Sequence, residues 1–255
     1  MARRDWTHDE TLMAWALYMA LPAKEIDDKG HDVRLLAEAL GRTPDAVALK
    51  AWNIAAHDER RLAKGKVGMQ HGSRLDREVW VEYDARGDAL LAEAMDLLDH
   101  ALDRELVSPG LRAVSVRVPA GTERQALVAQ RVNQSYFRNR LLENYGGRCC
   151  LTGLSVASLL VASHIKPWAA SDPVTERLAP DNGLLLNALH DRAFDQGLIT
   201  LDRELRVVVS PTVPHDDEAA ERALWDLAGR AIELPRAFAP RREFVEYHND
   251  VVFRR

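Results

Sequence analysis

Three polar residues, His164, Asn182 and His190, stand in the most distinctive stretch of the sequence. His164 ends the apolar run 159–163, which predicts a buried strand. Asn182 lies in the turn-forming sequence Pro-Asp-Asn-Gly at 180–183, and His190 opens a segment that predicts a helix. An unperturbed imidazole titrates near ~6.5, so it can accept a proton from water at neutral pH, and it can also bind a metal ion. Strand, turn and helix could therefore combine a general base with a metal ligand.

The same stretch resembles the HNH endonuclease family, whose ββα-metal site has this order of strand, turn and helix. In particular, it looks like the bacterial group found in restriction and modification-dependent nucleases. The motifs that carry the resemblance are Cys150-Leu-Thr-Gly153, Ser163-His-Ile-Lys-Pro-Trp168, Asn182-Gly-Leu-Leu-Leu186 and His190-Asp-Arg-Ala-Phe-Asp195-Gln-Gly197. A lead-in at 131–145 and a closing segment at 244–248 also fit the group, so the resemblance extends from about residue 122 to the end.

The resemblance implies a role for each residue of the motif. His164 would be the general base that activates water, and His190 would bind a divalent metal ion beside the phosphate. Asn182 would brace the loop between strand and helix and hold the base in orientation. Lys166 and Arg192 would contact phosphate.

The residue before the general base departs from the family. Many HNH sites carry Asp or a second His there as a metal ligand, whereas this sequence has Ser163, a weak ligand. Either Ser163 binds through water, or Asp191 or Asp195 supplies the oxygen. Asp195 lies five residues after His190, off that face of a helix, so orienting His190 or pinning the helix is its more natural role. With Asp195 kept as a possible ligand, the expected metal ligands are His190, Ser163 and Asp195. Such a set would hold the ion weakly, which favours Mg²⁺ or Mn²⁺ over Zn²⁺.

The 255-residue chain has a formal net charge of −5, which is unexpected for a DNA-binding protein. The charge is unevenly distributed. Residues 76–107 hold three basic and ten acidic side chains, a net of −7, whereas residues 108–150 hold seven Arg and two Glu, a net of +5. The segment leading to the histidines is therefore basic, although two solvated faces of opposite sign would give the same pattern.

Two further features limit the class of protein. The only cysteines, Cys149 and Cys150, are adjacent and cannot make the four-cysteine zinc ribbon of some HNH relatives, so any metal is expected to be catalytic. No segment approaches the ~20 apolar residues of a membrane span, and the N-terminus lacks the apolar region of a signal peptide. These features predict a cytoplasmic protein with no membrane partner.

Residues 5–60 predict three helices. Thr7 and Glu10 have the spacing of a capping box at the start of the first helix, and the second spans about 32–40. Thr43 and Pro44 form the cap and first position of the third. The second and third helices, joined by a short turn that contains Gly, have the pattern of a helix-turn-helix. This region also resembles Myb-like and winged-helix modules.

A helix-turn-helix places its last helix in the major groove, and the candidate DNA contacts are Arg42, Lys50, Asn53 and His57. A three-helix bundle that only packs or dimerises is the alternative. The next segments predict acidic helices at 76–106, a short strand of alternating valines at 114–118, and one or two helices at 123–145, where Arg138 is a further candidate DNA contact.

The later segments predict strands at 197–200 and 205–210 and helices at 218–228 and 244–248. The fold class is therefore α+β, with a mainly helical N-terminal domain before a ββα-metal domain. The expected domains are a DNA reader at 1–75, an acidic helical connector at 76–121 and an HNH nuclease domain at 122–255.

The function expected first is a metal-dependent endonuclease that hydrolyses phosphodiester bonds of double-stranded DNA and is directed to modified, for example methylated, DNA. One ββα site cuts one strand, so cutting a duplex needs two protomers, as in a homodimer, or two binding events. Two alternatives stay open. The HNH fold could be catalytically inactive in a DNA-binding regulator, which Ser163 would explain, or the protein could be a nuclease effector without a specific reader.

Overall fold

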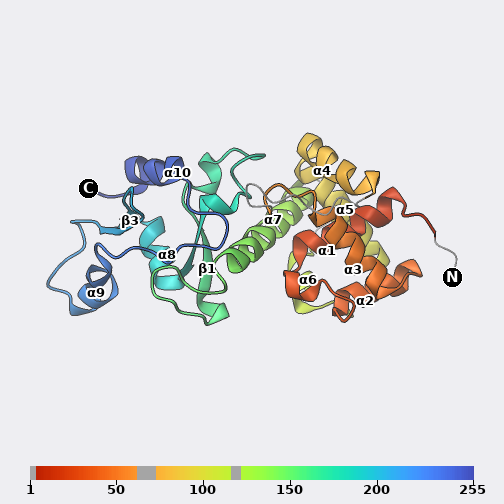
Figure 1. Ribbon diagram of the computed structural model, residues 1–255, viewed down its shortest axis with the longest axis horizontal. Helices are drawn as coiled ribbons and strands as arrows, with labels where there is room; N and C mark the ends of the chain where they lie inside the picture. Colours follow the sequence, from red (N-terminus) through yellow and green to blue (C-terminus); the bar gives the residue numbers. More distant parts are fainter. Residues whose placement is uncertain (1–3, 62–72, 116–121) are drawn as a thin grey trace. The chain divides into compact units, whose positions relative to one another are not determined.

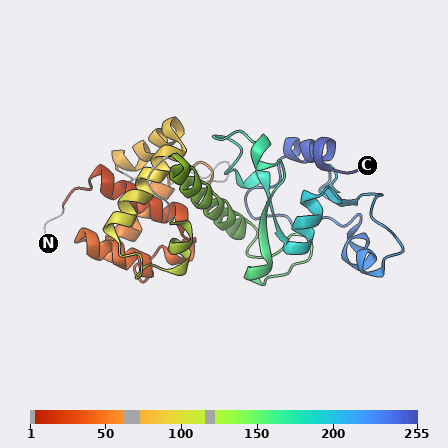
Figure 2. The same cartoon turned by 180° about the vertical axis from the view of Figure 1, so that it is seen from behind.

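The computed structural model describes residues 4–61, 73–115 and 122–255, with side chains in the last range from residue 126 onward. The chain forms two compact units, Met1–Asn139 and Arg140–Arg255, here unit 1 and unit 2; Figures 1 and 2 show them from two sides. In the described residues unit 1 is helical, whereas unit 2 combines short helices with two small sheets. The predicted α+β class is confirmed.

Unit 1 is built around α1 (His8–Ala20), which is buried on almost every side. Its N-terminus has the predicted capping box, because the Thr7 hydroxyl accepts from the Glu10 amide and the Glu10 carboxylate accepts from the Thr7 amide. The helices packed against α1 are α2 (His31–Leu40), α3 (Pro44–Ala55), α4 (Arg74–Arg86), α5 (Asp88–Ala101) and α6 (Pro109–Val114). The three predicted N-terminal helices are thus present, as is the acidic pair.

The acidic helices α4 and α5 belong to the same compact unit as α1. The Trp15 ring meets Trp80 and Tyr83 of α4 edge to face, with centroids 5.8 and 5.1 Å apart. Such contacts bury large aromatic surfaces that a separate connector would leave exposed. The two compact units meet after Asn139, and the functional domains expected at 1–75, 76–121 and 122–255 stay a prediction.

One predicted strand is partly a helix. Val114, the first of the alternating valines, is the last residue of α6. The Ser108 hydroxyl caps this helix and Pro109 occupies its first position, and this local start signal outweighs the alternation that follows. The remaining valines of the predicted strand lie at 116–118, outside the described residues. The one or two helices predicted at 123–145 form the single helix α7 (Thr122–Asn144).

The centre of unit 2 is a hairpin followed by a helix. Strands β1 (Leu160–His164) and β2 (Gly183–Asn187) pair antiparallel, with His164 opposite Gly183. Helix α8 (Ala188–Asp195) follows β2 directly and packs against both strands (Figure 1). The Asn187 side chain caps α8 by accepting from the His190 amide. The order of strand, loop, strand and helix is the ββα arrangement that the sequence predicted.

The remaining elements of unit 2 also follow the predicted order. They are β3 (Ile199–Leu201), β4 (Val207–Val209), α9 (Glu218–Ala223) and α10 (Arg242–Tyr247). Gly197 closes the turn after α8 with φ +68°, and a side chain there would place its Cβ 2.1 Å from the Val252 carbonyl oxygen. Only glycine therefore lets the C-terminal segment pack against the end of α8. Within the described ranges, no helix has the length and apolar character needed to cross a membrane.

Candidate active site

His164 is held at the end of β1 in a defined tautomer. Its Nε2 donates to the Arg177 carbonyl at 2.9 Å, since a carbonyl oxygen can only accept. In the neutral ring, Nδ1 then carries the lone pair that can take a proton. Burial lowers the pKa of His164, and the Arg177 carbonyl offsets part of this effect. The ring is therefore neutral at pH 7 and has the protonation state of a general base.

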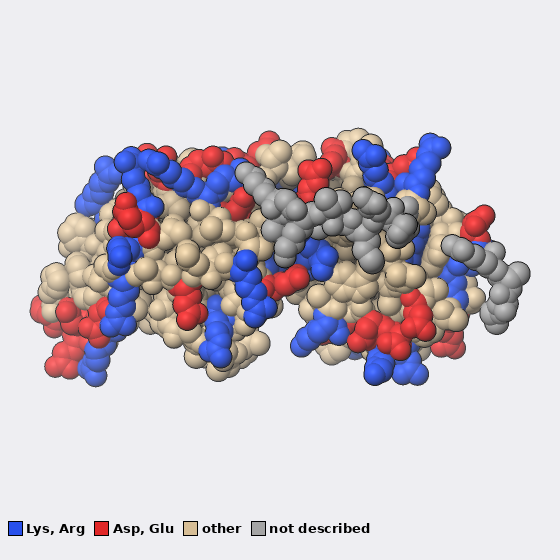
Figure 3. All heavy atoms as spheres, viewed as in Figure 1, with Lys and Arg blue, Asp and Glu red and all other residues tan. Residues whose placement is uncertain are grey.

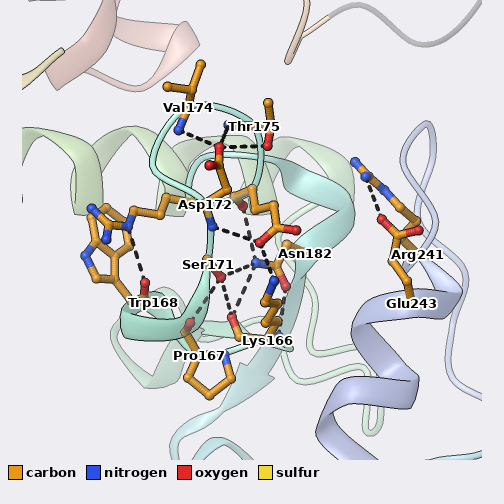
Figure 4. A network of polar contacts seen from close by, with 12 residues as sticks. Lys166, Pro167, Trp168, Ser171, Asp172, Val174, Thr175, Asn182, Arg241 and Glu243 are labelled. Carbon is orange, nitrogen blue, oxygen red and sulfur yellow. Dashed lines mark hydrogen bonds and ion pairs between the residues drawn. The ribbon is translucent and has the colours of Figure 1, made fainter.

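Asn182 braces the loop that supplies the Arg177 carbonyl. Its side chain is fully buried, and Oδ1 accepts from the Lys166 amide at 2.9 Å. Its Nδ2 donates to the Ser171 hydroxyl at 3.1 Å and lies 3.3 and 3.2 Å from the carbonyls of Lys166 and Glu176 (Figure 4). One amide thus joins both ends of the loop between β1 and Arg177. An amide suits this place because it offers donors and an acceptor together.

His190 faces the interior of unit 2. Its Nε2 donates to the Ala223 carbonyl at 2.9 Å, and its Nδ1 is buried beside the Cys149 thiol without a well-aligned hydrogen bond. Burial alone would raise the pKa of Cys149, but hydrogen bonding with His190 and Thr152 lowers it to about 7. Burial lowers the pKa of His190, and Cys149 raises it above its ordinary value. Both ring nitrogens of His190 are buried, and its expected role as a metal ligand stays a prediction.

Oxygen donors gather instead around Ser163 and the neighbouring face of α8. The Ser163 hydroxyl is buried, makes no well-aligned hydrogen bond and lies close enough to the Asp191 carboxylate to influence its pKa. Asp195 follows one turn later on the same helix face. Burial raises the pKa of both carboxyl groups, and the charge of Asp191 raises that of Asp195 further.

A buried hydroxyl without a well-aligned hydrogen bond and two neighbouring carboxylates are oxygen donors of the kind that a hard divalent cation such as Mg²⁺ or Mn²⁺ prefers. The set contains only two carboxylates, and in the part of the chain that the structure describes no three His, Cys, Asp or Glu side chains are grouped to hold a metal ion. Of the expected ligands, Ser163 lies beside Asp191, and Asp191 lies close enough to Asp195 to raise its pKa.

Residues 149–202 match a family model described as HNH endonuclease. The match supports the HNH family. It covers β1, the loop, β2, α8 and β3, which are the elements that position His164, Asn182 and Asp191. No curated protein matches the chain. The comparison therefore supports an HNH endonuclease domain in unit 2.

Two of the residues expected to contact DNA are engaged inside unit 1. The Arg42 guanidinium pairs with Glu10 at 2.7 Å and stacks over Trp6 at 3.9 Å. Lys50 is 4% exposed and pairs with the buried Asp76 carboxylate. Neither can reach a phosphate without breaking a largely desolvated ion pair.

The other expected contacts differ in accessibility. Asn53 and His57 are half-buried, and the exposed part of α3 also presents Asp45 and Leu49. Arg192 is exposed on α8 next to the oxygen donors. The remaining two are Arg138, which is half-buried and lines an open groove of unit 1, and Lys166, which pairs with Glu176 at 2.6 Å.

The sequence did not reveal three features of the site. Asp191 was only an alternative source of oxygen, although its i,i+4 spacing with Asp195 places both on one helix face. Arg177 contributes a main-chain carbonyl to His164, and no side-chain pattern reveals a carbonyl. The inward direction of His190 also follows from tertiary contacts with Ala223 and Cys149, which lie far from it in the sequence.

Proposed function

We propose that the protein is a metal-dependent DNA endonuclease whose reaction takes place in unit 2, with His164 as the general base. The observation that carries this proposal is the orientation of His164 by the Arg177 carbonyl within a segment that matches HNH endonucleases. A histidine fixed in this way accepts a proton through Nδ1 alone. That property is useful for activating water, and the match to HNH endonucleases is what distinguishes His164 from other histidines that donate to a carbonyl.

In the proposed reaction, Nδ1 of His164 takes a proton from the attacking water as its oxygen bonds to phosphorus. The bond between phosphorus and the 3′ oxygen breaks, leaving a 5′ phosphate and a 3′ hydroxyl after protonation from solvent. Asn182 keeps the loop and the Arg177 carbonyl in place, so His164 does not turn away. Arg192, exposed beside the site, can approach the phosphate backbone.

Asp191, Asp195 and Ser163 would hold the divalent ion, Mg²⁺ or Mn²⁺. When bound, the ion supplies positive charge for the phosphate and the departing oxygen. This assignment keeps two of the ligands expected from the sequence and replaces His190 by its neighbour Asp191. It also explains why Ser163 is tolerated where relatives have a stronger ligand, because two carboxylates from α8 already provide negative charge.

We further propose that unit 1 directs the nuclease to modified DNA. The helix-turn-helix order of α2 and α3 supports this reader, with Asn53 and His57 as its remaining candidate contacts. The burial of Arg42 and Lys50 in ion pairs favours the competing possibilities, a bundle that only packs and a nuclease effector without a reader. A regulator with an inactive HNH fold is favoured less, because His164 has the tautomer that catalysis needs.

A plasmid-cleavage assay with Mg²⁺ or Mn²⁺ tests both parts. The wild-type protein should cut, and His164→Ala should lose activity by roughly 10²- to 10⁴-fold, the usual contribution of a general base. Preference for a methylated plasmid would support the reader, and equal cutting of methylated and unmethylated plasmids would reject it. Absence of cutting by the wild type under every divalent ion, with DNA binding retained, would favour the inactive regulator.

A further inference from the structure

Trp168 and Arg177 both contact His164, and they also contact each other. The indole edge of Trp168 meets the imidazole with ring centroids 5.5 Å apart and planes at 86°. The Arg177 guanidinium lies 5.1 Å from the centre of the Trp168 ring, and its Nε donates to the Trp168 carbonyl at 3.3 Å. The Arg177 carbonyl accepts from His164. Each of the three residues therefore contacts the other two.

The loop between β1 and Arg177 depends on these contacts for its position, because much of it is exposed. Pro167, Ala169, Ala170 and residues 172–175 are exposed, so they contribute little burial to hold the loop in place. Asn182 fixes the loop near Lys166 and Glu176, but it touches neither Trp168 nor the Arg177 carbonyl. Trp168 and Arg177 contact the His164 ring itself.

The chemistry of the pair fits this task. A T-shaped aromatic contact fixes the plane of a ring without adding a charge, and a guanidinium over an indole is attracted by the electrons of the ring face. Trp168 and Arg177 are both half-buried rather than part of the apolar core. Their contacts are directed at each other and at His164, which a residue serving only to fill the core would not require.

We propose that Trp168 and Arg177 are positioning residues that hold the His164 imidazole in the orientation and tautomer of a general base. The indole fixes the plane of the imidazole, and the guanidinium clamps the indole and keeps the Arg177 carbonyl on Nε2. Neither residue needs to touch the substrate. This inference rests on the proposed nuclease reaction for its kinetic consequence, but its structural consequence can be measured without DNA.

The structural test uses nitrogen-15 chemical shifts of the His164 ring at alkaline pH, where the imidazole is neutral. The wild type should show one tautomer, protonated on Nε2. Trp168→Ala and Arg177→Ala should show a mixture of tautomers, and Trp168→Phe should restore the wild-type pattern because a ring edge remains. An unchanged His164 spectrum in both alanine variants would overturn the proposal.

The kinetic test uses the same variants in the cleavage assay. Trp168→Ala should lower kcat by about 10- to 100-fold, the cost expected when a catalytic group is misplaced by about 1 Å, with KM for DNA unchanged. A raised KM with normal kcat would instead make Trp168 a DNA contact and would also overturn the proposal.

Matched controls come from the same unit. Trp225 stacks on His215 at 3.9 Å, and Arg206 donates to the Gly229 carbonyl at 3.0 Å, so Trp225→Ala and Arg206→Ala remove similar contacts elsewhere. Both should leave the His164 tautomer and kcat unchanged. If wild-type protein never cleaves DNA, the nuclease proposal fails, while the tautomer measurement still decides the positioning role.

Discussion

At the scale of single residues, His164 and His190 have one contact in common but differ in their surroundings. His164 and His190 each donate Nε2 to a main-chain carbonyl. They differ in burial, because His190 is buried with its Nδ1 beside a thiol whereas His164 is half-buried at the end of a strand that leads into the exposed loop. We propose that this difference separates the general base from a histidine that packs.

The lowered pKa of His164 sets the direction of the pH dependence. A general base works only when neutral, and burial favours the neutral ring. With saturating Mg²⁺ and DNA, kcat should rise with pH and level off with a midpoint below the ordinary histidine value of about 6.5. The measurement is a pH profile of kcat from single-turnover cleavage. A midpoint at that value would mean that the ring is solvated, and a midpoint above it would mean that the ring is paired with a carboxylate; either result would contradict the structure.

The proposal that Asp191, rather than His190, binds the metal ion gives a second prediction. Asp191→Asn removes one carboxylate from the proposed site, so Mn²⁺ should bind more weakly, by at least about 10-fold, in a calorimetric titration without DNA. His190→Gln should bind Mn²⁺ like the wild type but unfold at a lower temperature, because it loses the contact beside Cys149. The reverse result, with loss of Mn²⁺ binding only in His190→Gln, would restore the sequence-based assignment.

At the scale of elements, local signals predicted most of the fold. The capping box at Thr7, the Thr43-Pro44 start of α3 and the apolar run of β1 all mark their elements within a few residues. These signals depend on neighbours in the chain, so the sequence shows them directly. The sequence could not show that Lys50 meets Asp76, because that pair joins separate helices and both residues belong to types that are usually exposed.

The Lys50–Asp76 pair leads to a stability prediction. Both side chains are buried, so Lys50→Ala leaves the Asp76 carboxylate without its cation and should lower the free energy of unfolding by about 3 kcal/mol or more. The control is Arg74→Ala, which removes an exposed pair with Glu78 and should change stability by less than about 1 kcal/mol. Urea unfolding measures both variants. Normal stability with weakened DNA binding in Lys50→Ala would support the original DNA-contact assignment.

At the scale of the whole molecule, charge argues for localised rather than extended binding of DNA. Unit 2 carries fourteen Lys or Arg and seventeen Asp or Glu, a net of −3. Many of its arginines are paired, such as Arg241 with Asp181 and Arg242 with Glu246. On the face drawn in Figure 3, basic and acidic side chains are interspersed. The divalent ion and a few accessible arginines would therefore supply most of the attraction for phosphate.

The number of chains that act on one duplex follows from the single site in each chain. One ββα site cuts one strand, so a double-strand break requires two protomers or two binding events, and nicked plasmid should appear before linear plasmid; here we predict two protomers. Adding His164→Ala protein to a fixed amount of wild type should raise the ratio of nicked to linear product, because mixed pairs cut only one strand. The time course is measured on agarose gels, with Asn53→Ala/His164→Ala as the matched variant that should bind DNA less well and interfere less. Linear product formed at an unchanged rate in the presence of excess His164→Ala would show that one chain cuts both strands by itself.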